Sequence, residues 1–469
     1  MKKLRVYLIK RHLILAIATA LILIACSSIF KPDSQLTNQS ATTISELNIW
    51  WEQGYNLEED EAIRRIVNTW QQQTGHQVKL SFYSTDELTA KAARAVKAGH
   101  PPDIMMNPKA DRILYPLLAW QNQLEDVSDI IKPIERDYSP QVLKAIAYHN
   151  SQTETTSYYG VPIDQSTIFV FYWQKLLASI GLNSQDIPRD WDNFWHFWQQ
   201  AQAQLKLQHN QDIFALGLPI SDSTSTSDTH YLFEQILEAH DIALFDQKGR
   251  LNVDNPTVRQ GIIQCLSWYA ELYQQGSIPP EAVNWTDTDN NRSLLNRLSL
   301  MTPNVTFSIS ATVRQDRDTY YNKLGIVEFP NKPNGQPMSH ILAIRQAVIF
   351  KDSLHKSQAK EFLRYFIQPQ ITVDYLQASG NRTQPVRNSV WLNSQWQKTQ
   401  DPYLAVATQV LTSEKTRLSN VVQHPAYSQV LAENVWGKAL TQVTANQINP
   451  EQATDEAIAE IKQIFQQWQ

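Results

Sequence analysis

Near the start of the globular part, the hydrophobic pattern switches repeatedly between two periods, and this constrains the fold more than any other feature. Residues 47–51, 78–82 and 103–107 are short apolar or alternating runs, as in strands. Between Ala62 and Trp70, apolar residues recur at helical spacing, and 84–99 opens with a Ser-x-x-Glu capping box. This β-α-β-α-β order predicts a doubly wound α/β lobe with a mainly parallel sheet.

This topology places polar and aromatic side chains at one edge of the predicted sheet. Trp51, Glu52 and Tyr83 end the first two strands, and Asp111 and Arg112 lie on the loop after the third. Ligands of doubly wound sheets bind beyond the carboxyl ends of the strands, so we expect these five residues at a binding edge. The Asp-Arg pair could bind hydroxyl groups bidentately. Alternatively the pair is solvated and inert, and Glu52 and Tyr83 are equally compatible with a structural role.

Residues 167–172 form a continuous apolar strand, which we interpret as the entry into a second lobe. Strands and helices alternate again beyond it. The helix that begins at Asn255-Pro256 carries Cys265 on its apolar face, where it is expected to be a buried hydrophobe. Further strands are expected at 215–218, 298–301, 324–327 and 343–350. Two further helices are expected to begin at Asp190 and after Trp285, and two more to cover 359–366 and 453–465.

The N-terminus carries the features of an export signal. Five basic residues and no acidic one precede an apolar run over 13–25, which is shorter than the about 20 residues of a relaxed membrane span. The run ends in Leu23-Ile24-Ala25-Cys26, which resembles the bacterial lipobox, whose Cys is lipidated and becomes the new N-terminus. We therefore predict a lipoprotein signal peptide over 1–25 and a lipid-anchored flexible tether over 26–44. The alternative is an uncleaved anchor helix with an incidental cysteine.

Charge and composition exclude several classes of function. The whole chain has 41 basic and 46 acidic residues. Without the five basic residues of 1–25, residues 26–469 contain 36 basic and 46 acidic residues, a net charge of −10. A nucleic-acid partner is not expected, because it requires a clustered basic face. With Cys26 lipidated, Cys265 has no partner for a disulfide. The 11 His lack the spacing of a zinc motif, so we expect no metal and no cofactor.

Seven runs along the chain fall in an order that characterises one family. They are Ile49-Trp50-Trp51-Glu52, Thr74-Gly75-His76-Gln77-Val78, and the stretches 99–104, 159–167, 188–194, 300–307 and 379–385. Together they resemble the bacterial extracellular solute-binding proteins of carbohydrate ABC transporters, the group that includes maltose-binding protein. The resemblance implies two doubly wound α/β lobes joined by a three-crossover hinge, the type II periplasmic-binding-protein fold. It assigns 45–161 plus 308–352 to the N-terminal lobe, and 162–307 plus 353–469 to the C-terminal lobe.

The same resemblance suggests ligand-binding residues on the hinge and the second lobe. Asp164 and Gln165 follow the hinge turn, where the family often places a ligand carboxylate; Asp164 could alternatively cap local backbone amides. Asn304 and Phe307 end the second crossing, and Phe307 stands where the family usually has a Trp that stacks on sugar. The remaining candidates are Trp285 and Asp287, in a segment that faces the cleft in relatives; Tyr231, which could alternatively pack under a loop; and Arg382, which could alternatively form a surface salt bridge.

The sequence thus favours a non-catalytic receptor, a monomer on the periplasmic or outer side of a bacterial membrane. It would close on a sugar, such as a di- or oligosaccharide, polyol or glycoside, and deliver it to ABC permease subunits, while the lipid on Cys26 holds it at the membrane. Phosphate-cradling and nucleophile-elbow motifs are lacking. Two alternatives remain: a glycoside hydrolase with two carboxylates, and a ligand-sensing subunit that signals to a membrane kinase.

Overall fold

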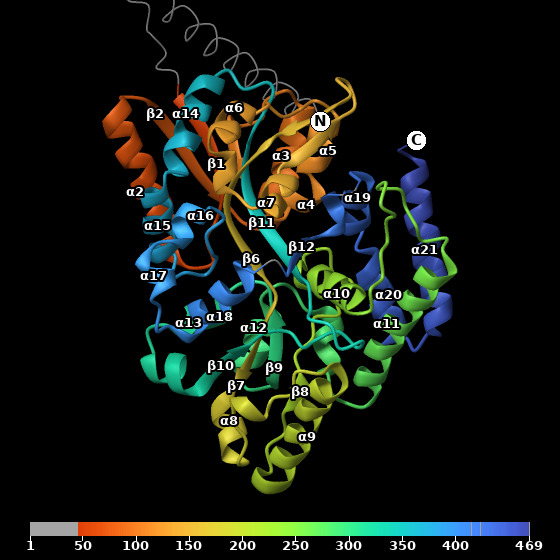
Figure 1. Ribbon diagram of the computed structural model, residues 1–469. Helices are drawn as coiled ribbons and strands as arrows, with labels where there is room; N and C mark the ends of the chain where they lie inside the picture. The colour runs from red at the N-terminus through yellow and green to blue at the C-terminus, as the bar shows by residue number, and fades with distance from the viewer. Residues whose placement is uncertain (1–45, 414, 423, 469) are drawn as a thin grey trace, which may run out of the picture. The chain divides into compact units, whose positions relative to one another are not determined.

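The computed structural model describes residues 46–413, 415–422 and 424–468 (Figure 1). The predicted signal peptide, Cys26 and the tether up to residue 44 lie outside the described residues. None of the described helices is both long and apolar enough to span a membrane.

The predicted β-α-β-α-β unit is present, and it builds the first sheet. Strand β1 pairs in parallel with both β2 and β3, and β11 continues the sheet antiparallel to β3. Side chains of β1 alternate, so that Leu47 and Ile49 are fully buried in the core. Among the described residues this sheet has the order β12-β11-β3-β1-β2, with β6 paired to β11. Its strands are β1 (Glu46–Glu52), β2 (Gln77–Tyr83), β3 (Ile104–Met106), β6 (Gly160–Thr167), β11 (His340–Ile349) and β12 (Thr416–Leu418).

Capping residues fix the helices of this unit. Asn56 accepts from the Glu59 N–H at the start of α2 (Leu57–Thr74), and Gly75 ends that helix with a left-handed φ of 77°. Ser84 accepts from Glu87 N–H at the start of α3 (Thr85–Lys97). The other helices near the first sheet are α4 (Ala110–Ile113), α5 (Tyr115–Trp120), α6 (Ser128–Ile131), α7 (Pro140–Ala145), α14 (Lys356–Phe366), α15 (Pro369–Ala378), α16 (Asn388–Trp391) and α17 (Ser394–Gln397).

A second sheet follows the apolar strand that the sequence predicts as the entry into a second lobe. Its order is β10-β7-β9-β8, and all five side chains of β7 are buried. The strands are β7 (Phe169–Trp173), β8 (Phe214–Leu216), β9 (Ser299–Asn304) and β10 (Leu324–Val327), while β4 (Ala147–Asn150) and β5 (Thr155–Tyr158) form a separate hairpin. The accompanying helices are α8 (Gln174–Ser179), α9 (Trp191–His209), α12 (Asp289–Leu295), α13 (Ser308–Val313) and α18 (Pro402–Leu411).

Five further helices pack on one another, and α10 also contacts β11 while α19 contacts α4 and α5. Cys265 is fully buried on α11, as expected from its apolar helix face. Asn255 caps this helix, with Pro256 at its first position. The five are α10 (Asp228–Ala239), α11 (Pro256–Gln274), α19 (Ala426–Ala432), α20 (Val435–Val443) and α21 (Pro450–Gln466).

The chain passes from one sheet to the other at residues that differ from the predicted lobe boundaries. All of β6 up to Thr167 pairs with β11, so the first passage lies between β6 and β7 and not at residue 161 (Figure 1). β10 pairs with β7, so 308–327 stays with the second sheet, contrary to expectation. The close approach of β10 requires Gly325, because a Cβ there would lie 2.3 Å from the Tyr172 ring.

Elements after residue 353 also differ from the expected bounds. Phe366 of α14 contacts Trp51 of β1 with ring centroids 5.4 Å apart, and β12 pairs with β11. Residues 353–378 and 416–418 therefore lie with the first sheet, although we expected them in the second lobe. These memberships depend on packing between distant segments, which local sequence pattern does not encode.

Candidate functional site

A cavity of about 250 Å³ is lined by residues from elements of both sheets, and we call it the cleft cavity. Elements of the first sheet line one side, and α10, α12 and the end of β9 line the other. The paired strands β6 and β11 contribute Ser166, Ala343 and Arg345. Its other lining residues are Glu52, Gln53, Tyr55, Thr85, Pro108, Lys109, Arg112, Ser227, Asp228, Tyr231, Asp287, Thr288, Asn291, Asn304, Val305, Thr306, Ser308 and Arg382.

Arg112 and Asp111 present unpaired hydrogen-bonding atoms beside an aromatic ring. The Arg112 guanidinium lies 4.8 Å from the centre of the Tyr231 ring, and its Nη2 donates to Ser227. Within the described part of the chain, its Nε and Nη1 and the Oδ1 of Asp111 have no partner. Burial raises the pKa of Asp111 well above its ordinary value, although Arg112 opposes this. A small cavity of about 30 Å³ adjoins these two side chains.

Acidic groups occupy two other parts of the cleft cavity. Burial raises the pKa of Glu52, which accepts a hydrogen bond from Thr85. Asp287 accepts from the Asp228 N–H at 3.1 Å, at the start of α10. Burial, and then the negative charge of Asp287, raise the pKa of Asp228 well above its ordinary value. The cavity therefore holds two carboxyl groups, those of Glu52 and Asp228, whose neutral form burial favours.

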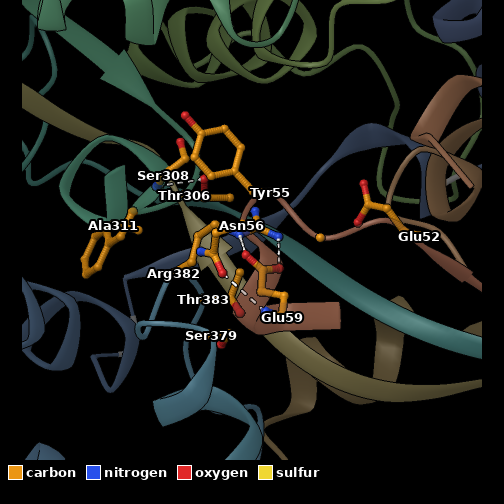
Figure 2. Close-up of polar contacts among 12 residues, drawn as sticks. Glu52, Tyr55, Asn56, Glu59, Thr306, Ser308, Ala311, Ser379, Arg382 and Thr383 are labelled. Carbon is orange, nitrogen blue, oxygen red and sulfur yellow. Dashed lines mark hydrogen bonds and ion pairs between the residues drawn. The ribbon is translucent and has the colours of Figure 1, made fainter. Parts of the chain in front are cut away.

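Two arginines of the cavity wall are held by buried carboxylates. Arg345 binds Asp164 through Nε and Nη2 at 2.6 and 2.5 Å, and the Asp164 side chain is fully buried. Arg382 binds Glu59 of α2 at 2.7 and 2.8 Å, as Figure 2 shows, with the Tyr55 ring 5.9 Å from the guanidinium carbon. Bidentate pairs of this kind fix both guanidinium planes at the cavity wall.

About half of the predicted site residues reach the cleft cavity. Asp111 lies at the adjoining small cavity, which Arg112 and Tyr231 also line. Those that line the cleft cavity itself are Glu52, Arg112, Tyr231, Asp287, Asn304 and Arg382. That they bind a ligand stays a prediction.

The remaining candidates lie elsewhere for packing reasons. Trp51 and Phe307 are only 1% and 4% exposed and pack against Phe366 and Phe169, respectively. Trp285 is also buried in the core. The other three are Asp164, which is held by Arg345; Gln165, which faces a different cavity; and Tyr83, which packs on Trp50.

Several lining residues were not predicted. Tyr55 lies three residues after the end of β1, so its position at a strand end was a usable signal. Arg345 and Asn291 had no such signal, because the first lies within a long buried strand and the second within a helix.

A sequence profile described as bacterial extracellular solute-binding protein matches residues 65–405. The chain belongs to this family. The family resemblance and the two-lobed type II fold expected from the sequence are thereby confirmed. The family is extracellular, which places its members in the periplasm or at the cell exterior. A comparison with curated proteins finds no match.

Solved structures of solute-binding proteins share the fold. A Thermotoga lettingae ABC transporter solute-binding protein, bound to α-D-tagatose, is 19% identical, covers 89% of this chain and 99% of its own, and has a TM-score of 0.72. A maltose-bound T. maritima protein is 17% identical, with coverages of 89% and 99% and a TM-score of 0.70. A putative oligosaccharide-binding protein from Synechococcus sp. is 15% identical, with coverages of 90% and 100% and a TM-score of 0.72.

Proposed function

We propose that this receptor captures a sugar in the cleft cavity and delivers it to the permease subunits of an ABC importer. The unpaired atoms of Arg112 over the Tyr231 ring, at the wall of this cavity, carry the proposal, and the unpaired oxygen of Asp111 lies at the small cavity beside it. Sugars offer hydroxyl groups that both donate and accept, together with apolar C–H faces, and this arrangement complements both. Relatives of the same fold that are bound to tagatose and maltose support the same ligand class.

The sugar that fits has one or two rings. The cavity volume of about 250 Å³ lies just below the range of roughly 300–1,000 Å³ for drug-sized ligand pockets. Contacts between the two sides flank it: Lys109 donates to the Thr224 carbonyl at 2.7 Å, and the hydroxyls of Tyr55 and Thr312 lie 3.1 Å apart. A longer oligosaccharide would have to break these contacts.

The proposal includes a lipid on Cys26 that tethers a monomeric receptor to the membrane, and no catalysis. The lipobox-like run and the basic, apolar N-terminal segment support the tether. In such a receptor the sugar contacts both sides only when the cleft is shut, so that binding itself selects the closed arrangement.

Calorimetry on the full chain in detergent tests the proposal, with tagatose, glucose, maltose and maltotetraose as ligands. We expect saturable binding of a mono- or disaccharide and weaker binding of maltotetraose. Arg112→Ala should weaken the binding about tenfold or more, because it removes a buried charged donor.

Arg317→Ala is the matched control, because Arg317 also lies over a tyrosine ring, 5.1 Å from the centre of Tyr321, but outside the cleft cavity. It should bind sugar as the unaltered chain does. Equal loss in both variants, or no binding of any sugar, would contradict the proposed site. Release of reducing ends from maltotetraose would identify a hydrolase instead.

A further inference from the structure

A second cavity, of about 550 Å³, lies on the opposite face of the strands that join the two sheets, and we call it the hinge cavity. On β6, Ser166 lines the cleft cavity, whereas its neighbour Gln165 lines the hinge cavity. On β11, Ala343 lines the first and Leu342 the second. Successive side chains of a strand point to opposite faces, so the two cavities share the β6–β11 ribbon as a common wall.

The hinge cavity combines an apolar floor with a polar rim. Its floor consists of Leu342, Val386, Trp391 and Leu411, each no more than 8% exposed. Amide and hydroxyl groups surround the floor, and none of the lining residues within the described ranges is charged. These polar residues are Ser139, Gln141, Gln165, Asn388, Gln397, Thr412, Ser413 and Thr416.

Part of this polar rim is free to bind. The Gln165 Nε2 donates to the Pro385 carbonyl at 2.6 Å, which holds its amide in place at the cavity. Among residues 46–413, 415–422 and 424–468, the side chains of Gln141 and Asn388 have no hydrogen-bond partner. Amides both donate and accept, as vicinal hydroxyl groups do, so the rim fits a neutral polyhydroxy molecule better than an ion.

The walls of the hinge cavity belong to both halves of the receptor. Helix α7 supplies Gln141 and packs on β12 of the first sheet, whereas α18 supplies Leu411 and packs on β10 of the second. A rotation of one sheet against the other therefore changes the distance between these walls. A molecule that fits one arrangement better shifts the equilibrium toward that arrangement.

We propose that the hinge cavity binds a small neutral polyhydroxy molecule, and that its occupation changes the affinity of the cleft cavity for sugar. The effect on sugar affinity rests on the proposed function, whereas binding in the hinge cavity does not.

The test uses methyl α-D-glucoside as the probe and ligand-observed saturation-transfer NMR on the full chain. Three proteins carry the cleft change Arg112→Ala: one alone, one with Asn388→Trp, and one with Ser394→Trp. Asn388 is an exposed rim residue, so an indole there fills the cavity without disturbing the core. Ser394 is also exposed but does not line the cavity, so it is the matched control.

We expect saturable binding in the cleft variant, its loss with Asn388→Trp, and its retention with Ser394→Trp. No saturable binding in the cleft variant, or equal binding in all three, would overturn the hinge site and leave the cleft proposal untouched. For the coupling, Asn388→Trp alone should change the calorimetric affinity for cleft sugar about threefold or more, in either direction. If the NMR test shows binding in the hinge cavity but Asn388→Trp leaves the affinity of the cleft cavity for sugar unchanged, the coupling is overturned.

Discussion

The two aromatic residues Phe307 and Tyr231 occupy very different environments, although both were candidates for stacking on sugar. The Phe307 ring lies among Phe169, Phe171 and Tyr403, with ring centroids 5.3 to 6.1 Å apart, on the core side of the chain. Tyr231 lies at the cleft cavity beneath the Arg112 guanidinium. The family resemblance suggested both residues, Phe307 at the end of a strand and Tyr231 after a polar loop. Only the packing of β7 and α18 shows that the Phe307 ring belongs to the core.

Phe307→Ala should lower the free energy of unfolding by about 3–5 kcal/mol, the usual cost of removing a buried phenylalanine ring. Chemical denaturation measures this change. Tyr231→Ala should lose less stability and weaken sugar binding more, because its ring borders the cleft cavity. Unchanged stability together with weakened sugar binding in Phe307→Ala would instead assign that ring to the ligand site.

At the scale of elements, the sequence predicted the helices whose starts are marked by local capping residues. Helix α9 begins after the Asp190 cap, and α11 begins at Pro256 after the Asn255 cap, as the pattern indicated. The bounds of the lobes were less predictable, because they depend on contacts between distant segments. The pairing of β10 with β7, for example, needs the absent side chain of Gly325 opposite Tyr172, and no periodicity reveals such a contact.

The first turn of α10 sets two electrostatic effects against each other. The positive end of a helix dipole stabilises a carboxylate, which favours the charged form of Asp228. Burial and the nearby Asp287 disfavour that form, and they prevail, because the pKa of Asp228 is raised well above its ordinary value. Asn290 donates to Asp228 at 3.0 Å, a bond that an amide oxygen could also accept.

Asp228→Asn should therefore raise the melting temperature at neutral pH and change it little in acid. The raised pKa means that the folded chain holds this proton more tightly than the unfolded chain, in which Asp titrates near roughly 3.9. The stability of the unaltered protein thus falls as the pH rises from that value through the raised pKa, and the variant escapes this loss. Melting curves of both proteins at a series of pH values measure the difference.

Asp316→Asn is a control of opposite sign. Asp316 accepts from the Thr319 backbone N–H and hydroxyl, which lower its pKa, so its contribution to stability is present at neutral pH and lost as the pH falls. This variant should melt lower at neutral pH. A lower neutral melting temperature for Asp228→Asn as well would contradict the assigned direction.

At the scale of the whole molecule, the cleft cavity depends on segments far apart in the chain. Glu52 and Arg112 come from the first sheet, Asp228 and Asn304 from the second-sheet side, and Arg382 from a late turn. The order of strands and helices suggested Glu52 and Arg112, because topology alone brings strand ends to one edge. The family resemblance suggested Asn304 and Arg382, and Asp228 was not predicted. The missed Arg345 depends on its antiparallel pairing with β6, which a single sequence does not specify.

Closure should depend on contacts that never touch the sugar. Arg314, at the end of α13 beside the second sheet, pairs with Glu58 in the first turn of α2 beside the first sheet, and neither residue lines the cleft cavity. Arg314→Ala removes a contact that exists only when the two sides are close, so the open arrangement should become more populated. Because the pair is partly exposed, its loss costs about 0–1 kcal/mol, which weakens sugar affinity by about fivefold at most.

Small-angle scattering of the sugar-free protein and calorimetry with sugar measure this effect together. Arg314→Ala should increase the radius of gyration without sugar and lose that increase when sugar is saturating, because bound sugar again selects the closed arrangement. Arg364→Ala is the control: its pair with Asp129 contains a carboxylate of similar exposure and a more exposed arginine, and it joins α14 to α6, both beside the first sheet. If Arg364→Ala increases the radius of gyration as much as Arg314→Ala does, the lost charge acts through general destabilisation. If only Arg314→Ala increases it, the effect comes from the contact between the two sides.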